Sequence, residues 1–263
     1  MDNDDRPVGR VLTRREVLAL LGAGGAAVLA ACAPGQTATA QPTIAAAQPT
    51  TAAAATPAAG TVALPSCIVR PEQTEGPYFV DEELNRADVR SDPSDGSVQE
   101  GVPLQLAFQV SQVTADGCTP LAGAQVDIWH CNALGVYSDV SDPGFNTTGK
   151  KFLRGYQMTD ANGLAQFTTI YPGWYRGRTV HIHFKIRAQS ASGQNLEFTS
   201  QLYFDDSLSD QVFAQAPYSG KGTRSFKNEG DGIYRAGGDQ LLLDVAEAGE
   251  GYATTFAIGL QMA

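Results

Sequence analysis

Short segments in which apolar and polar residues alternate recur through residues 66–263. Leu104–Val113 alternates in this way, and Leu164–Ile170 is rich in β-branched and aromatic residues. Successive side chains of a strand point to opposite faces, so each segment is typical of a strand with a buried face. Further strands are predicted at residues 125–131, 155–159, 179–187, 198–204, 240–245 and 252–260.

Turn-forming residues separate these segments. Asp160–Gly163 (DANG) predicts a β-hairpin, and helical periodicity is confined to a short stretch near Ser207–Ala214. Many short strands joined by Gly- and Pro-containing turns predict an all-β fold. We expect a β-sandwich of mostly antiparallel strands with little helix.

The first 32 residues have the pattern of an export signal. A positively charged start precedes Val17–Leu29, an apolar stretch that is too short to span a bilayer comfortably. Residues 13–18 (TRREVL) resemble a twin-arginine signal, and residues 29–32 (LAAC) resemble a bacterial lipobox. The alternative is an ordinary signal peptide with an incidental cysteine. We expect export and lipid anchoring at Cys32, at the cell surface or in the periplasm.

Residues 33–65 contain no charged and no aromatic residue. Their Ala, Thr, Pro and Gln residues cannot bury enough apolar area to offset chain entropy, which predicts a disordered tether. Residues 66–263 then form one domain. The chain is 43% hydrophobic, and its formal net charge of −10 argues against nucleic acid as a partner. A homodimer through a strand edge is compatible with this pattern, although no residue points to it.

The domain contains three cysteines, Cys67, Cys118 and Cys131. Export permits a disulfide, and the odd number leaves at least one free thiol. Cys118–Cys131 is the least favoured pair, because the strand predicted between them would hold its ends too far apart. Pairing of Cys67 with either of the others stays open.

Two of the three histidines in the chain flank a single residue, in His181-Ile182-His183. On a strand these two side chains share a face and can converge on one metal ion, while Val180, Ile182 and Phe184 face the other way. The alternative is a pair of buried, hydrogen-bonded histidines. No Cys-x-x-Cys is present, which argues against a zinc–thiolate site.

Seven stretches of the domain form an ordered set of motifs: residues 72–78 (EQTEGPY), 129–138 (WHCNALGVYS), 152–155 (FLRG), 159–163 (TDANG), 172–175 (PGWY), 178–184 (RTVHIHF) and 199–204 (TSQLYF). Together they resemble the intradiol ring-cleavage dioxygenases, the non-haem Fe(III) enzymes that cleave catechol and protocatechuate. The resemblance covers most of residues 67–206 in order.

The resemblance implies an iron site and a reaction. The Fe(III) ligands fall on Tyr137, Tyr175, His181 and His183, and Tyr171 is an alternative to Tyr175. By resemblance, bound catecholate displaces the Tyr175 tyrosinate, and O2 then opens the ring between its two hydroxylated carbons to give a muconate-type diacid. No organic cofactor is implied.

Further roles follow from the same motifs. Arg178 would stabilise negative charge that develops on the ring. Gln201 would lie beside the same pocket, and Tyr78 would line its mouth. His130 matches no ligand and is expected to pack. The loop between Tyr175 and His181 is shorter than in the catabolic enzymes of the family. This predicts a less enclosed pocket and does not determine which catechol is the substrate.

Two other functions fit parts of the pattern. A non-catalytic, transthyretin-like binding module on a lipid tether would explain the strands and the linker, but not the tyrosines together with the histidines. A metal hydrolase would use His181, His183 and a carboxylate. Colour distinguishes them, because tyrosinate bound to Fe(III) makes a protein red.

Overall fold

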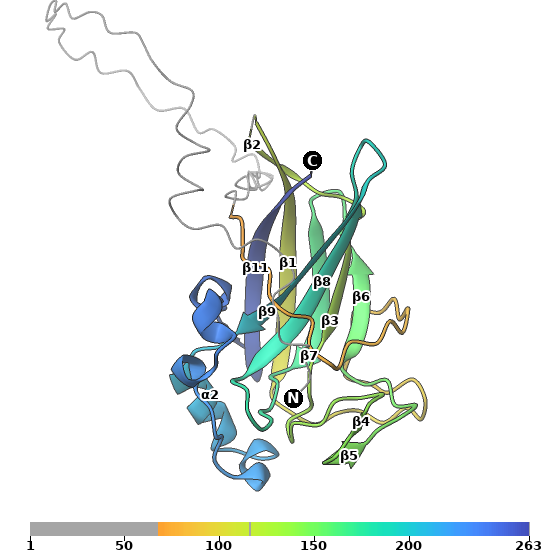
Figure 1. Ribbon diagram of the computed structural model, residues 1–263. Helices are drawn as coiled ribbons and strands as arrows, with labels where there is room; N and C mark the ends of the chain where they lie inside the picture. The colour runs from red at the N-terminus through yellow and green to blue at the C-terminus, as the bar shows by residue number, and fades with distance from the viewer. Residues whose placement is uncertain (1–67, 116, 263) are drawn as a thin grey trace, which may run out of the picture. The chain divides into compact units, whose positions relative to one another are not determined.

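Two β-sheets pack face to face (Figure 1). The first contains β1 (Pro103–Thr114), β2 (Gly117–Pro120), β7 (Leu164–Ile170), β10 (Ala246–Ala248) and β11 (Gly251–Gln261). The second has the order β6-β3-β8-β9, with β3 (Gln125–Trp129), β6 (Arg154–Met158), β8 (His181–Gln189) and β9 (Asn195–Tyr203). Of the strand pairs in these sheets, β1 and β11 are parallel and the others antiparallel. The predicted sandwich is confirmed.

The computed structural model describes residues 68–115 and 117–262, which belong to one compact unit. The export signal ending at Cys32 and the tether at 33–65 lie outside the described residues. None of the helices described is long and apolar enough to cross a membrane.

Alternation along the strands builds the core between the sheets. Leu104, Leu106 and Phe108 of β1 are buried, and their neighbours along the strand are more exposed. The Phe108 ring meets Phe184 of β8 with 5.3 Å between ring centroids. Burial of these large side chains is the main favourable contribution to folding.

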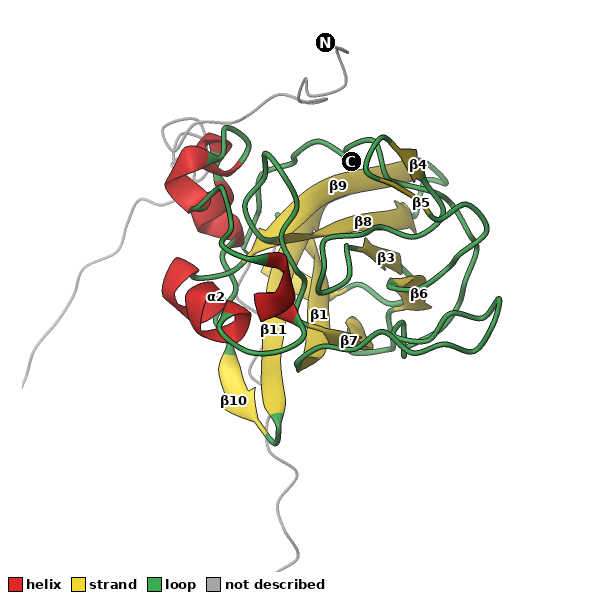
Figure 2. Ribbon diagram, turned by 90° about the horizontal axis from the view of Figure 1, so that it is seen from below, coloured by secondary structure: helices red, strands yellow, loops and turns green. Residues whose placement is uncertain are grey.

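Short helices lie beside β9 and β11, and a small hairpin of β4 (Ser141–Asp142) and β5 (Phe145–Asn146) lies on the opposite side (Figure 2). The α-helix α2 spans Asp206–Phe213, as predicted for this region, and the Asp205 side chain caps it. Four 3-10 helices follow: η1 (Tyr218–Lys221), η2 (Asn228–Gly230), η3 (Tyr234–Ala236) and η4 (Gly238–Leu241).

Two local predictions were wrong. Residues 240–245 do not form a strand: η4 ends at Leu241, whose side chain is buried, and β10 begins only at Ala246. Asp160–Gly163 is a tight turn, with the Asp160 carboxylate accepting from the Leu164 N–H at 2.9 Å, but it joins β6 and β7 in different sheets. Turn residues determine a reversal of the chain and do not determine which strands pair.

Cys131 is a buried free thiol, and Cys118 is disulfide-bonded. The expectation that Cys118 and Cys131 do not pair is therefore confirmed. The partner of Cys118 lies outside the described residues.

Candidate metal centre

Strand β8 is buried on both faces over its first six residues. Ile182, Phe184 and Ile186 point into the core between the sheets. The alternate positions His181 and His183 therefore face the other side of the same sheet, where they are 2% and 1% exposed. This placement follows from the two-residue period predicted for the strand.

The two imidazoles converge. Their Nε2 atoms are 3.0 Å apart, and Nδ1 of His181 lies 2.7 Å from the carbonyl oxygen of Thr179. Because only a protonated Nδ1 can donate to that carbonyl, Nε2 of His181 carries the lone pair. Two ring nitrogens at this separation suit adjacent ligands of one ion, each about 2.1 Å from it.

Strand register sets the surroundings of His183. The pairing of β3, β8 and β9 places Trp129, His183 and Gln201 in one row across the sheet. The Trp129 indole stacks on the His183 ring with centroids 5.0 Å apart and 6° between the planes. Nδ1 of His183 is buried without a hydrogen-bond partner, so this stack, rather than a second hydrogen bond, fixes the plane of the ring.

Tyr137 lies on the loop that follows β3 and is 1% exposed. Its hydroxyl oxygen is 3.4 Å from Nε2 of His181. The Asn132 side chain shapes this loop by accepting from the N–H groups of Leu134 and Val136, each at 3.0 Å. Gly135 has φ +75° and lies so close to Trp174 that a Cβ would be 2.1 Å from its carbonyl oxygen. A glycine is required here for the two tyrosine loops to meet.

Tyr175 comes from the loop that precedes β8 and is partly exposed. Its ring centroid lies 5.6 Å from the ring centroids of both Tyr137 and His181. Gly177, with φ +90°, turns the chain between Tyr175 and Arg178. Burial raises the pKa of the Tyr175 hydroxyl to about 12, and the positive charge of Arg178 acts against this shift.

Tyr171 lies elsewhere. It is fully buried, its hydroxyl shares a hydrogen bond of 2.8 Å with Oγ of Ser209 in α2, and its ring packs on Phe204 at 4.4 Å. Of the two alternative tyrosines, the structure therefore brings Tyr175 to the histidines and places Tyr171 in the core.

Arg178 and Gln201 are joined at the edge of this cluster. Nη2 of Arg178 donates to Oε1 of Gln201 at 2.6 Å, and Nε donates to Oδ2 of Asp231 at 2.8 Å. Gln201 is fully buried and its amide nitrogen donates to the Thr74 carbonyl oxygen at 2.9 Å. Burial would lower the pKa of Arg178, but Tyr175 and Asp231 reverse this and raise it above its ordinary value. Arg178 is thus a fixed positive charge beside Tyr175.

Tyr78 lies over the tyrosine pair and is partly exposed. Its ring centroid is 4.6 Å from that of Tyr137, and its hydroxyl donates to Oδ2 of Asp142 at 2.7 Å. Its ring therefore packs against both Tyr137 and Tyr175. His130 is buried with Nδ1 2.9 Å from the Cys131 carbonyl oxygen and Nε2 2.7 Å from the Thr169 hydroxyl, so it packs away from the cluster.

The donors that meet at this point are two imidazoles and two phenols. Burial raises the pKa of Tyr137 well above that of free tyrosine, and a bound cation would favour its phenolate. Hard, anionic oxygen with neutral nitrogen suits Fe(III): two phenolates would leave one net positive charge for a further anion. The residues therefore fit a ferric ion. Elsewhere in the described chain, no group of three or more His, Cys, Asp or Glu side chains could hold a metal.

Sequence reasoning missed three contributors to this site. Trp129 stacks on His183, Arg154 holds the Tyr137 loop, and Asp231 binds Arg178. Trp129 and Arg154 lie within stretches that had been recognised as similar to the family. Asp231 is 53 residues from Arg178 and belongs to no motif, so no signal in the sequence could have found it.

The β-sandwich thus places two histidines on the outer face of one sheet and two tyrosines on loops beside them. A family model described as a dioxygenase matches residues 74–224, more than half of the chain. This chain belongs to the intradiol ring-cleavage dioxygenases.

Named relatives agree with this assignment. The chain is 38% identical over 117 residues to catechol 1,2-dioxygenase of Candida albicans, a match that covers 36% of this chain and 37% of that one. It is 27% identical to the protocatechuate 3,4-dioxygenase beta chain of Burkholderia cepacia, over 70% of this chain and 76% of that one. The matches span less than half the length of the catechol 1,2-dioxygenases of Candida albicans and Acinetobacter lwoffii (37% and 49%).

Among solved structures, an intradiol ring-cleavage dioxygenase from Tetranychus urticae is similar, with a TM-score of 0.65 and 29% identity. That match covers 74% of this chain and 95% of the other.

Proposed function

We propose that this protein is a ferric dioxygenase that cleaves a catechol-type ring between its two hydroxyl-bearing carbons. One molecule of O2 is consumed and both of its atoms enter the product, a muconate-type diacid. The observation that carries this proposal is the convergence of Tyr137 and Tyr175 with the paired Nε2 atoms of His181 and His183.

Tyr137, Tyr175, His181 and His183 would hold Fe(III). The ion would supply a chelation point for both oxygens of the catechol and activate the ring toward O2. The Thr179 carbonyl keeps the proton of His181 on Nδ1, and Trp129 keeps the plane of His183. Both rings therefore present their Nε2 atoms without rearrangement, which lowers the cost of binding.

Tyr175 is the phenol that is free to move, because it is partly exposed and lies on a loop, whereas Tyr137 is buried. As a phenolate, its oxygen would accept a proton from a substrate hydroxyl. Arg178, held at Nε and Nη2, presents a fixed positive charge where negative charge develops on the ring. Tyr78 offers an aromatic face at the entrance.

We also propose that the enzyme is exported and held by a lipid on Cys32, which would let it act on catechols outside the cytoplasm. The support is the arginine-rich start, the short apolar stretch and the LAAC sequence. Labelled palmitate incorporated into the wild-type chain and not into Cys32→Ser is the expected result. Equal labelling of both chains would refute anchoring at this residue.

The test of the activity is spectroscopic and chemical. The iron-loaded full chain is expected to absorb visible light, and its band is expected to shift when catechol is added under argon. On admission of 18O2, both labelled atoms should appear in a diacid of the mass of catechol plus O2. A colourless protein after iron reconstitution, or a product that lacks the label, would refute the proposal.

A further inference from the structure

Asp231 connects the C-terminal part of the domain to the candidate metal centre. It follows η2, its side chain is 1% exposed, and both of its carboxylate oxygens have partners. Oδ2 accepts from Nε of Arg178 and from the N–H of Thr179, both at 2.8 Å. Oδ1 accepts from the N–H of Ile233 at 2.8 Å. A buried carboxylate with fixed donors on both oxygens defines the position of whatever it binds.

The guanidinium of Arg178 is consequently held from two sides. Asp231 takes its Nε, and Oε1 of Gln201 takes its Nη2 at 2.6 Å. Since the guanidinium is planar and rigid, two contacts fix both its place and its orientation. Asn228, on the same segment as Asp231, accepts from the Thr179 hydroxyl at 2.7 Å, so the residue next to Arg178 is also held.

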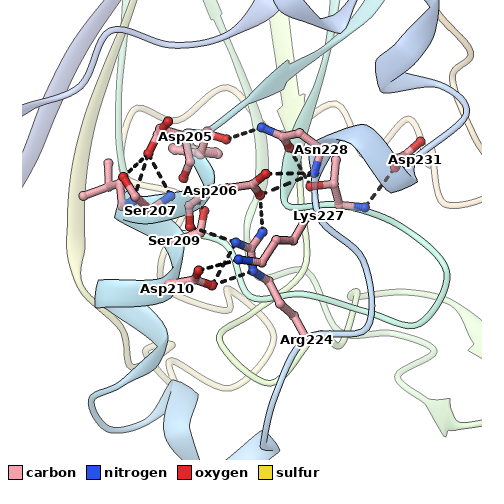
Figure 3. A network of polar contacts seen from close by, with 12 residues as sticks. Asp205, Asp206, Ser207, Ser209, Asp210, Arg224, Lys227, Asn228 and Asp231 are labelled. Atoms are coloured by element: carbon pink, nitrogen blue, oxygen red, sulfur yellow. Dashed lines mark hydrogen bonds and ion pairs between the residues drawn. The ribbon is translucent and has the colours of Figure 1, made fainter.

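The segment that carries Asn228 and Asp231 is anchored away from the site (Figure 3). Arg224, 3% exposed, donates to the carboxylates of Asp206 and Asp210 in α2, with its Nη2 2.8 Å from Oδ1 of Asp210. Lys227 donates to Oδ2 of Asp210, also at 2.8 Å. The buried Arg224 guanidinium, held by two carboxylates of α2, ties this segment to the helix, so the segment that carries Asp231 also has contacts that do not involve the metal centre.

We propose that Asp231 is a positioning residue that acts through Arg178: it holds the guanidinium at the site where the catechol ring binds. This inference rests on the proposed function. Without the Asp231 contact, Nε of Arg178 loses the acceptor that holds it, and the guanidinium can rotate about its bond to Gln201. The positive charge would then be displaced from the ring.

The first experiment compares Asp231→Asn with Asp239→Asn in the iron-loaded full chain. Both changes remove one negative charge from the same region, but Asp239 is exposed and lies in η4. An asparagine offers one acceptor oxygen and cannot serve the donors on both sides of Asp231. We expect kcat/KM for catechol to fall by about 10- to 100-fold in Asp231→Asn and to stay unchanged in Asp239→Asn. An unchanged kcat/KM in Asp231→Asn would overturn the proposal.

A double-mutant cycle separates positioning from a general structural role. In the Arg178→Gln background, Asp231→Asn is expected to change kcat/KM by less than about twofold, because the group it positions is gone. The same fold-loss in both backgrounds would show that Asp231 acts through the scaffold and would overturn the proposal.

A measurement on the unmutated chain decides the contact independently of activity. With diamagnetic Ga(III) in place of iron, the Nε–H of Arg178 is expected to show an NMR signal protected from solvent exchange. A rapidly exchanging Nε–H would overturn the proposal even if Asp231→Asn fails to fold. Failure of the proposed function is distinguishable, since the wild-type chain would then show neither the visible band nor ring cleavage, while the Arg178 signal would remain protected.

Discussion

Removal of the hydroxyl should lower stability at Tyr171 and damage the metal centre at Tyr175, although the two tyrosines are only four residues apart in the chain. Tyr171→Phe deletes a buried hydroxyl whose partner, Oγ of Ser209, is 2.8 Å away. Ser209 keeps its bond to the Asp205 carbonyl oxygen at 2.9 Å, so no buried group is left without a partner. The expected loss is that of one neutral hydrogen bond, about 1 kcal/mol of unfolding free energy. For a domain of this size this lowers Tm by about 2–4 °C.

Tyr175→Phe should leave the fold intact and damage the site. The side chain is partly exposed, and Arg178 keeps its bonds to Asp231 and Gln201, so the unfolding free energy should change by less than about 0.5 kcal/mol. The loss of an anionic oxygen that accepts a substrate proton should lower kcat at least about 100-fold. The visible band of the iron-loaded protein should weaken and shift.

Urea unfolding, iron content and the visible spectrum of both variants give the comparison. The reasoning predicts a stability loss with a normal band for Tyr171→Phe, and normal stability with an altered band for Tyr175→Phe. The reverse outcome, with the band lost in Tyr171→Phe and intact in Tyr175→Phe, would refute the assignment of Tyr175 as the second tyrosine ligand.

Three further predictions concern stability. Arg154→Met removes the donors to the Ser138 and Tyr78 carbonyl oxygens, so it should destabilise the iron-loaded chain more than the surface control Arg90→Met does. The control removes an exposed ion pair and should cost about 0–1 kcal/mol; equal losses in the two variants would contradict the prediction. Phe184→Ala should cost about 3–5 kcal/mol in urea unfolding, because its ring fills the core between the sheets; a loss below about 1 kcal/mol would show that the core collapses to fill the space. Burial lowers the pKa values of all three histidines, two of them to about 4 and about 3, so the unfolded iron-free chain binds more protons below pH 6.5. Its unfolding free energy should therefore fall as the pH drops from 6.5, by up to about 1.4 kcal/mol per pH unit for each imidazole. Asp127 offsets one of these protons, because burial raises the pKa of its carboxyl to about 6. An unfolding free energy that stays constant between pH 7 and pH 5 would refute this prediction.

The local pattern of apolar and polar residues was sufficient to predict most of the long strands and part of the site. A two-residue period predicted β8 and therefore placed His181 and His183 on one face, because strand geometry alone determines which side chains share a face. The strands at 164–170 and 252–260 were also found within a few residues of their observed bounds, and a possible helical turn was indicated near Ser207–Ala214, where α2 lies. The similarity of the motifs added the two tyrosines.

The tertiary structure alone decided how these parts meet. Tyr171 and Tyr175 lie on the same connection between β7 and β8, and the choice between them depends on which one packs into the core, where Tyr171 meets Ser209 and Phe204. The stack of Trp129 on His183 depends on strand register, and the bond from Arg178 to Asp231 spans 53 residues. The strand predicted at 240–245 was wrong for the same reason: Leu241 is buried by tertiary packing at the end of η4, and the local pattern does not show this. Periodicity specifies the direction of a side chain, whereas its partner is determined by packing and register between segments far apart in the chain.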